Sequence, residues 1–179
     1  MSLQDRIDWD ATYRARPPAA GDGPPRSFAP HAGAFPVAGT ALDVACGQGQ
    51  ASVWLAKRGL QVWGVDVSPV AVEQAAALAA REAVADRCRF DVVELDEGLP
   101  PGPSADVVLC NRFRDRRLDG ALVERLAPGG VLAICVLSEV GGPVGRFRAA
   151  PGELATAFAG LTVIAADEGA GEAWLLARK

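Results

Sequence analysis

The sequence has little histidine and no long apolar run. His31 is the single histidine among 179 residues, which excludes a zinc site built on several histidines. No apolar run approaches the roughly 20 residues that span a bilayer, so we expect no membrane partner. The net charge is -4, and a nucleic-acid partner is not expected because such a partner requires a basic face.

The cysteines also lack the close spacing of metal ligands. Cys46, Cys88, Cys110 and Cys135 are far apart in the chain, and two of them lie in apolar runs. We therefore expect reduced thiols and no metal site. The first residues have no apolar stretch of the signal-peptide kind, which favours a cytoplasmic location.

What the chain does have is an alternation of short apolar strands and helical segments. Strands are predicted over 41–44, 61–65, 88–93, 106–110, 131–137, 161–166 and 172–177, and helices over 50–58, 69–84, 118–126 and 151–158. The last two strands are close enough for a hairpin. The pattern predicts an α/β fold, a Rossmann-like doubly wound sheet of about seven strands that is mostly parallel with an antiparallel closing hairpin.

The chain divides into an arm and one domain. Residues 1–36 are expected to form an N-terminal arm or lid, not an independent domain, in which Trp9 and Tyr13 share one helix face. Residues 17–36 are rich in proline and glycine and are interpreted as a mobile connection with one helical turn near 27–34. Residues 37–179 are expected to form the ligand-binding domain.

One stretch, residues 41–50, carries the clearest chemical signal. An apolar strand ends in Asp43, and a turn with Gly47 and Gly49 leads into a helix. Dinucleotide sites use three spaced glycines, or a final alanine, and here the third position is Ser52. A carboxylate at Asp43 would repel a phosphate but attract a cation. S-adenosylmethionine, which carries an ammonium and a sulfonium and no phosphate, fits this turn better.

Two further acids follow the next two strands. Asp66 ends the second strand, where an acid accepts hydrogen bonds from ribose hydroxyls. Glu94 ends the third strand beside Leu95, and a carboxylate there fits the amino edge of an adenine. Each acid alone is an ordinary strand-end charge, but the three together with the glycine turn predict a nucleoside site.

These motifs resemble those of the class I S-adenosylmethionine-dependent methyltransferases. The resemblance rests on 41–49, on 65–69 and on 126–132, and Ala45 stands where many members have glycine. Residues 9–14 and 54–59 are similar to the tellurite-resistance and thiopurine-type methyltransferases. A glutamate at position 94 in place of the commoner aspartate departs from the pattern.

The resemblance implies a set of cofactor contacts. The methionyl end would lie near Asp43, Ala45, Cys46, Gly47 and Gly49, the ribose near Asp66 and Val67, the adenine near Glu94 and Leu95, and the transferred methyl near Asn111. The implied activity is methylation of a small-molecule acceptor.

Two other functions stay open. A cofactor-binding protein without catalysis is possible because no general base is identified and the region after Val140 is short. A nicotinamide-dependent oxidoreductase is opposed by Asp43 and Ser52. Four arginines after the fourth strand could attract an anionic acceptor, but a solvated surface partly neutralised by Asp115 and Asp119 is the favoured interpretation; they are Arg112, Arg114, Arg116 and Arg117. The acceptor and the oligomeric state are not predicted.

Overall fold

Alternating strands and helices form one sheet in the computed structural model, which describes residues 3–19, 23–145 and 147–179, with side chains from residue 5 onward. The strands are β1 (Gly39–Val44), β2 (Leu60–Asp66), β3 (Cys88–Val92), β4 (Ala105–Asn111), β5 (Leu126–Ser138), β6 (Arg148–Ala149), β7 (Thr162–Gly169) and β8 (Glu172–Arg178). The α-helices are α1 (Leu3–Ala15), α2 (Gln50–Lys57), α3 (Pro69–Arg81), α4 (Asp119–Arg125) and α5 (Glu153–Ala157). Short 3-10 helices are η1 (Arg26–Ala34), η2 (Ala85–Arg87), η3 (Leu95–Glu97) and η4 (Arg116–Leu118).

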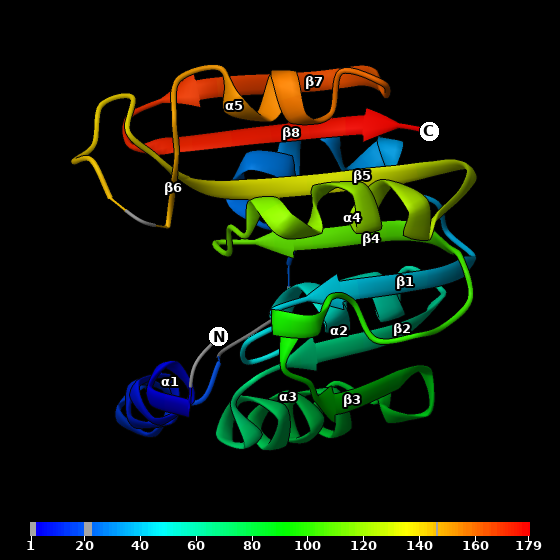
Figure 1. Ribbon diagram of the computed structural model, residues 1–179. Coiled ribbons are helices and arrows are strands. Elements are labelled where there is room, and N and C mark those ends of the chain that lie inside the picture. Colours follow the sequence, from blue (N-terminus) through cyan, green and yellow to red (C-terminus); the bar gives the residue numbers. More distant parts are fainter. Residues whose placement is uncertain (1–2, 20–22, 146) are drawn as a thin grey trace.

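The sheet order is β3-β2-β1-β4-β5-β8-β7, with β6 paired to β5 (Figure 1). The first five strands are parallel, and β8 runs antiparallel to both β5 and β7. The predicted α/β sheet with an antiparallel closing hairpin is confirmed. In register, Val44 pairs with Cys110, so the residues that follow β1 lie beside the end of β4.

Two apolar clusters cover the two faces of the sheet. One joins the strands to α4 and α5, which lie over one face in Figure 1, and includes Leu122 and Phe158. The other joins the strands to α2, α3 and η1 and includes Leu55 and Leu78. Parallel strands that are buried on both faces require such continuous apolar sequences, and this is why β1 and β4 could be recognised.

Local signals at α3 act as the sequence indicates. Ser68 caps the helix, because its hydroxyl accepts a hydrogen bond from the Ala71 N–H at 3.2 Å, and Pro69 occupies the first turn. The buried positions Ala71, Ala75 and Leu78 lie on one side of the helix. This helix therefore begins directly after the carboxyl end of β2.

Two expectations differ from the structure, and one short strand was not expected. The helical turn expected near 27–34 is confirmed by η1, but segment 26–36 is not a loose connection: Phe28 and Phe35 are 0% and 2% exposed and pack into the α2–α3 face of the core. The Pro128–Gly130 segment does not separate a helix from a strand, because α4 ends at Arg125 and these residues form an irregularity inside β5. The two-residue strand β6 has no signal in its sequence.

Candidate functional site

A cavity of about 560 Å³ lies at the edge of the sheet where β1, β2 and β4 end. Ligands of open α/β sheets bind at this carboxyl edge. Seven of the residues predicted to contact a cofactor line the cavity, namely Asp43, Ala45, Cys46, Gly47, Asp66, Val67 and Asn111.

Asp43 is a buried carboxyl group in the floor of this cavity. It is 1% exposed, and the Ser52 hydroxyl donates a hydrogen bond to its Oδ2 at 2.5 Å. Burial raises the pKa of Asp43 to about 7, and the hydrogen bond from Ser52 opposes this rise. No hydrogen bond or ion pair joins a lysine or arginine of the described residues to Asp43, so a cationic ligand would be its first strong electrostatic partner. Ser52, which counts against a dinucleotide in the sequence, thus holds this acid in place.

The turn after β1 brings backbone groups to the cavity. Ala45 and Gly47 have φ values of +56° and +54°, and the Cys46 N–H donates to the Val65 carbonyl at 3.0 Å. A left-handed alanine costs about 1–2 kcal/mol, which is the kind of strain that collects at functional sites. A Cβ on Gly47 would lie 3.0 Å from the Tyr13 hydroxyl, so this glycine makes room for the arm.

Gly49, the second glycine of the predicted turn, packs closely against α3. It does not line the cavity, and a Cβ there would lie 2.7 Å from the Cβ of Ala75 and 3.0 Å from its Cα. Its φ is +78°. The residue is glycine because the start of α2 presses against α3, which keeps the turn at Gly47 in place.

Asp66 links the turn after β1 to the turn after β2 through hydrogen bonds. Its Oδ2 accepts the Gly47 N–H at 2.9 Å and its Oδ1 accepts the Ser68 N–H at 2.9 Å. Burial raises the pKa of Asp66, and these backbone hydrogen bonds partly offset the effect. A carboxylate has about four acceptor sites, so Asp66 can accept a further hydrogen bond from a ligand in the cavity.

The predicted adenine residues lie outside the cavity lining. Leu95 is 1% exposed and belongs to the core cluster on the α4–α5 face, whereas Glu94 is exposed. The sequence identifies a strand-end acid here, but it does not give the direction of the side chain.

The N-terminal helix α1 lies beyond the carboxyl ends of β1 and β2 (Figure 1). The Ser68 hydroxyl donates a hydrogen bond to Asp10, and the Gln74 amide donates to the Tyr13 carbonyl at 3.1 Å. Trp9 and Tyr13 stack with ring centroids 5.7 Å apart, and both line the cavity. The predicted pairing of these two rings on one helix face is confirmed.

The far end of the cavity is formed by β4, β5, β8 and η1. The Ser27 hydroxyl and the Cys135 thiol are hydrogen-bonded at 3.5 Å, and the Arg112 N–H donates to the Cys135 carbonyl at 2.6 Å. The Arg112 guanidinium pairs with Glu172 at 2.8 Å, and Arg112 has a φ of +60°. None of these pairings has a local sequence signal.

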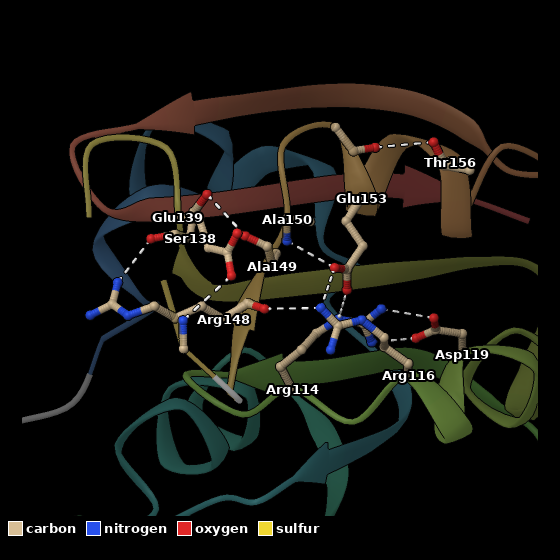
Figure 2. Close-up of polar contacts among 12 residues, drawn as sticks. Arg114, Arg116, Asp119, Ser138, Glu139, Arg148, Ala149, Ala150, Glu153 and Thr156 are labelled. Atoms are coloured by element: carbon tan, nitrogen blue, oxygen red, sulfur yellow. Dashed lines mark hydrogen bonds and ion pairs between the residues drawn. The ribbon is translucent and has the colours of Figure 1, made fainter. Parts of the chain in front are cut away.

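The other arginines after β4 are paired, and one of them is buried. Arg114 is 4% exposed; it donates two hydrogen bonds to Asp119, and its Nε donates to Glu153 at 2.7 Å. Arg116 also donates to Glu153, as Figure 2 shows. Arg117 pairs with Asp115 at 2.6 Å. The expected neutralisation by Asp115 and Asp119 is confirmed, but the expectation of a solvated basic surface is wrong for Arg114.

This network connects to the segment that contains β6 (Figure 2). Glu153 also accepts the Ala150 N–H at 2.9 Å, and Arg148 donates to the Ser138 carbonyl at 2.8 Å. The loop after β4 is therefore fixed to the end of β5, and this holds the far end of the cavity in shape.

Within the described residues, no group of three or more histidine, cysteine, aspartate or glutamate side chains could hold a metal ion. Among the helices described, none is long and apolar enough to cross a membrane.

Comparison with known proteins gives the family. Residues 41–130, half of the chain, match a family described as a methyltransferase domain. The ribosomal RNA small subunit methyltransferase C of Alcanivorax borkumensis is 38% identical over 104 residues, which are 52% of this chain and 31% of that enzyme. The chain spans less than a third of the length of the curated relatives it matches.

Solved structures share the fold. TehB from Haemophilus influenzae has a TM-score of 0.70 and 19% identity, covering 79% of this chain and 57% of that one. Geranyl diphosphate C-methyltransferase from Streptomyces coelicolor, solved with S-adenosyl-L-homocysteine, has a TM-score of 0.71 and 14% identity, covering 99% and 98%. The family match covers the turn after β1 and the ends of β2 and β4, and the chain therefore belongs to this family of methyltransferase domains.

Proposed function

We propose that this protein is an S-adenosylmethionine-dependent methyltransferase that acts on a small-molecule acceptor. The observation that carries the proposal is the pair of buried acids, Asp43 and Asp66, in one cavity at the carboxyl edge of the sheet. Both have raised pKa values because they are buried. A ligand with an ammonium, a sulfonium and ribose hydroxyls supplies the cations and donors that these carboxyl groups lack.

The residues present fit this cofactor at its methionyl end and its ribose. Asp43 and the turn at Ala45, Cys46 and Gly47 would hold the methionyl end, with Gly49 supporting the turn from outside the cavity. Asp66 and Val67 would hold the ribose, and Asn111 would border the methyl group. The proposed adenine contact of Glu94 and Leu95 would be made from the rim, where the Glu94 side chain is exposed.

The bound cofactor would supply a methyl group on a sulfonium, which transfers to a nucleophile while the sulfur leaves as a thioether. The protein's task is then to align donor and acceptor and to exclude water. Tyr13 and Trp9 would form the wall over the turn, and Asn111 and Phe113 would form the wall at the acceptor side. No side chain is assigned as a general base.

Residues 1–36 are proposed to act as the arm over the site, and residues 37–179 as the catalytic domain. The hydrogen bonds of Asp10 and Gln74 support the first assignment, because they hold α1 beside the cavity. The small-molecule acceptor is supported by the size of the cavity and by the likeness to an enzyme named for a small acceptor, geranyl diphosphate C-methyltransferase. All four cysteines are free, which supports action in the reducing cytoplasm.

Calorimetric titration with S-adenosylhomocysteine, S-adenosylmethionine and NAD⁺ tests the proposal. The first two should bind and the third should not. Asp66→Ala should weaken binding by about 1–3 kcal/mol through lost hydrogen bonds. Asp106→Ala is a matched control, because Asp106 also accepts a backbone N–H, from Thr40 at 2.8 Å, and does not line this cavity.

Failure of both S-adenosyl compounds to bind overturns the proposed function, and unchanged affinity in Asp66→Ala overturns the ribose assignment. Release of S-adenosylhomocysteine across a panel of phenols, thiols, amines and carboxylates then tests catalysis. Tight binding without turnover on any of them favours a cofactor-binding protein.

A further inference from the structure

The cavity has more cationic side chains than the cofactor has anionic groups. Arg16, Arg26 and Arg112 all line it. Arg112 pairs with Glu172 at 2.8 Å. Within the part of the chain that the structure describes, no carboxylate forms an ion pair with Arg16 or Arg26; Arg16 only stacks over the Tyr13 ring at 5.3 Å.

Arg16 lies at the same end of the cavity as the two buried acids. Its guanidinium covers Tyr13, and the Tyr13 hydroxyl lies over Gly47, whose N–H is bound by Asp66. This is the end proposed for the methionyl group, which carries one carboxylate. Arg16 is the cation suited to that carboxylate, because a guanidinium binds a carboxylate through parallel hydrogen bonds.

Arg26 lies toward the opposite end. Its chain neighbour Ser27 is hydrogen-bonded to Cys135 of β5, and Cys135 is paired with Asn111 of β4. Asn111 borders the proposed position of the methyl group, so Arg26 belongs to the acceptor side. Among the described residues no carboxylate forms an ion pair with Arg26, and Glu172 of this cavity is engaged by Arg112.

We propose, on the basis of the function proposed above, that the acceptor is a small molecule with a carboxylate or phosphate group, and that Arg26 binds this oxyanion. Asn111 and Phe113 line the same cavity as Arg26 and the cofactor turn. A cationic acceptor would meet the unpaired guanidinium of Arg26 and would be repelled. Arg26 is thus a specificity-determining residue.

The arginines that follow Arg112 cannot take this role. Arg114, Arg116 and Arg117 do not line the cavity, and each is paired with one or more carboxylates. The anion site therefore lies on η1 and not in the run of arginines after β4. That run is basic in sequence but is neutralised in the fold.

Binding of three probes that share a phenyl ring tests the inference. Benzoate, phenyl phosphate and benzamide are titrated by ligand-observed NMR into protein saturated with S-adenosylhomocysteine. At least one anion should bind about tenfold more tightly than benzamide, which is about 1.4 kcal/mol. The anion that binds more tightly distinguishes a carboxylate from a phosphate acceptor.

Arg26→Gln should remove most of this preference and leave the affinity for S-adenosylhomocysteine within about twofold, because it leaves the cofactor end intact. Arg14→Gln is the matched control, an exposed arginine of the same arm that does not line the cavity. Benzamide binding as tightly as both anions, no measurable binding of any probe, or a preference that survives in Arg26→Gln would overturn the inference. The cofactor titration reports separately on the proposed function.

Discussion

At the β1–β2 end of the cavity, the two acids and the turn after β1 are fixed by contacts between residues close in the chain, and only the α1 arm is held there by distant contacts. Asp43 and its hydrogen-bond partner Ser52 are nine residues apart. Asp66 accepts hydrogen bonds from Gly47, nineteen residues away, and from Ser68, two residues away. At the β4–β5 end, Arg112 meets Glu172 across sixty residues and Ser27 meets Cys135 across 108.

The β1–β2 end is the kind of site that members of a protein family share, whereas the β4–β5 end is the kind that differs between members. The β1–β2 end, here called the local end, consists of a strand, a turn and the start of a helix, which a short sequence motif can specify. The distant end depends on β8, on η1 and on the support of Arg114. We therefore expect the cofactor end to tolerate few changes and the acceptor end to carry the individuality of this protein.

The largest expected effect on stability comes from Arg114, which supports the β4–β5 end of the cavity. Arg114→Met removes a buried guanidinium and leaves Asp119 and Glu153 without it, at side-chain exposures of 20% and 14%. Breaking a buried ion pair costs about 3–5 kcal/mol, and we expect about 3 kcal/mol here because the acids are partly solvated. Urea unfolding measures this. A variant as stable as the wild type would show that the network does not hold the loop.

A substitution at Gly49 tests the packing of the β1–β2 end most directly. Gly49→Ala should cost about 2–3 kcal/mol more than Gly152→Ala in the free energy of unfolding. Both glycines have positive φ values, +78° and +70°, but a Cβ at Gly152 meets nothing within 4 Å. The pair of variants thus separates the close approach of α2 and α3 from backbone strain. Equal losses of stability would contradict the packing role.

The fold and the local end could be predicted because the evidence is contiguous in the chain. Buried parallel strands give apolar runs, and the Ser68–Pro69 cap marks the start of α3. The hydrogen bond from Ser52 to Asp43 is not predicted by the sequence, because the direction of the Ser52 hydroxyl depends on how α2 packs. The direction of Glu94, the burial of Arg114 and the strand β6 depend on contacts between distant segments, which a single sequence does not report.

The buried carboxyl group of Asp43 also predicts that the affinity for the cofactor depends on pH. In the free protein the pKa of Asp43 is raised to about 7, and a bound cation favours the ionised form and lowers it. The affinity for S-adenosylmethionine should therefore fall as the pH drops below about 7, by up to about tenfold per pH unit. Calorimetry in buffers of different ionisation heat should detect proton release below this pH. Asp43→Asn should remove the dependence.

The smallest expected effect comes from Ser52→Ala. The hydrogen bond from Ser52 lowers the pKa of Asp43, so its loss should move the pH at which affinity begins to fall to a higher value. The same titration series measures the shift. A midpoint that stays in place or moves to lower pH would contradict the role assigned to Ser52.

The most direct test of the proposed cofactor site is a crystal structure of the complex with S-adenosylhomocysteine. The ribose hydroxyls should lie within hydrogen-bond distance of Asp66, the methionyl group over the turn at Ala45 to Gly47, and the sulfur opposite Asn111. A ligand bound away from this edge of the sheet, or bound here with its ribose out of reach of Asp66, would contradict it.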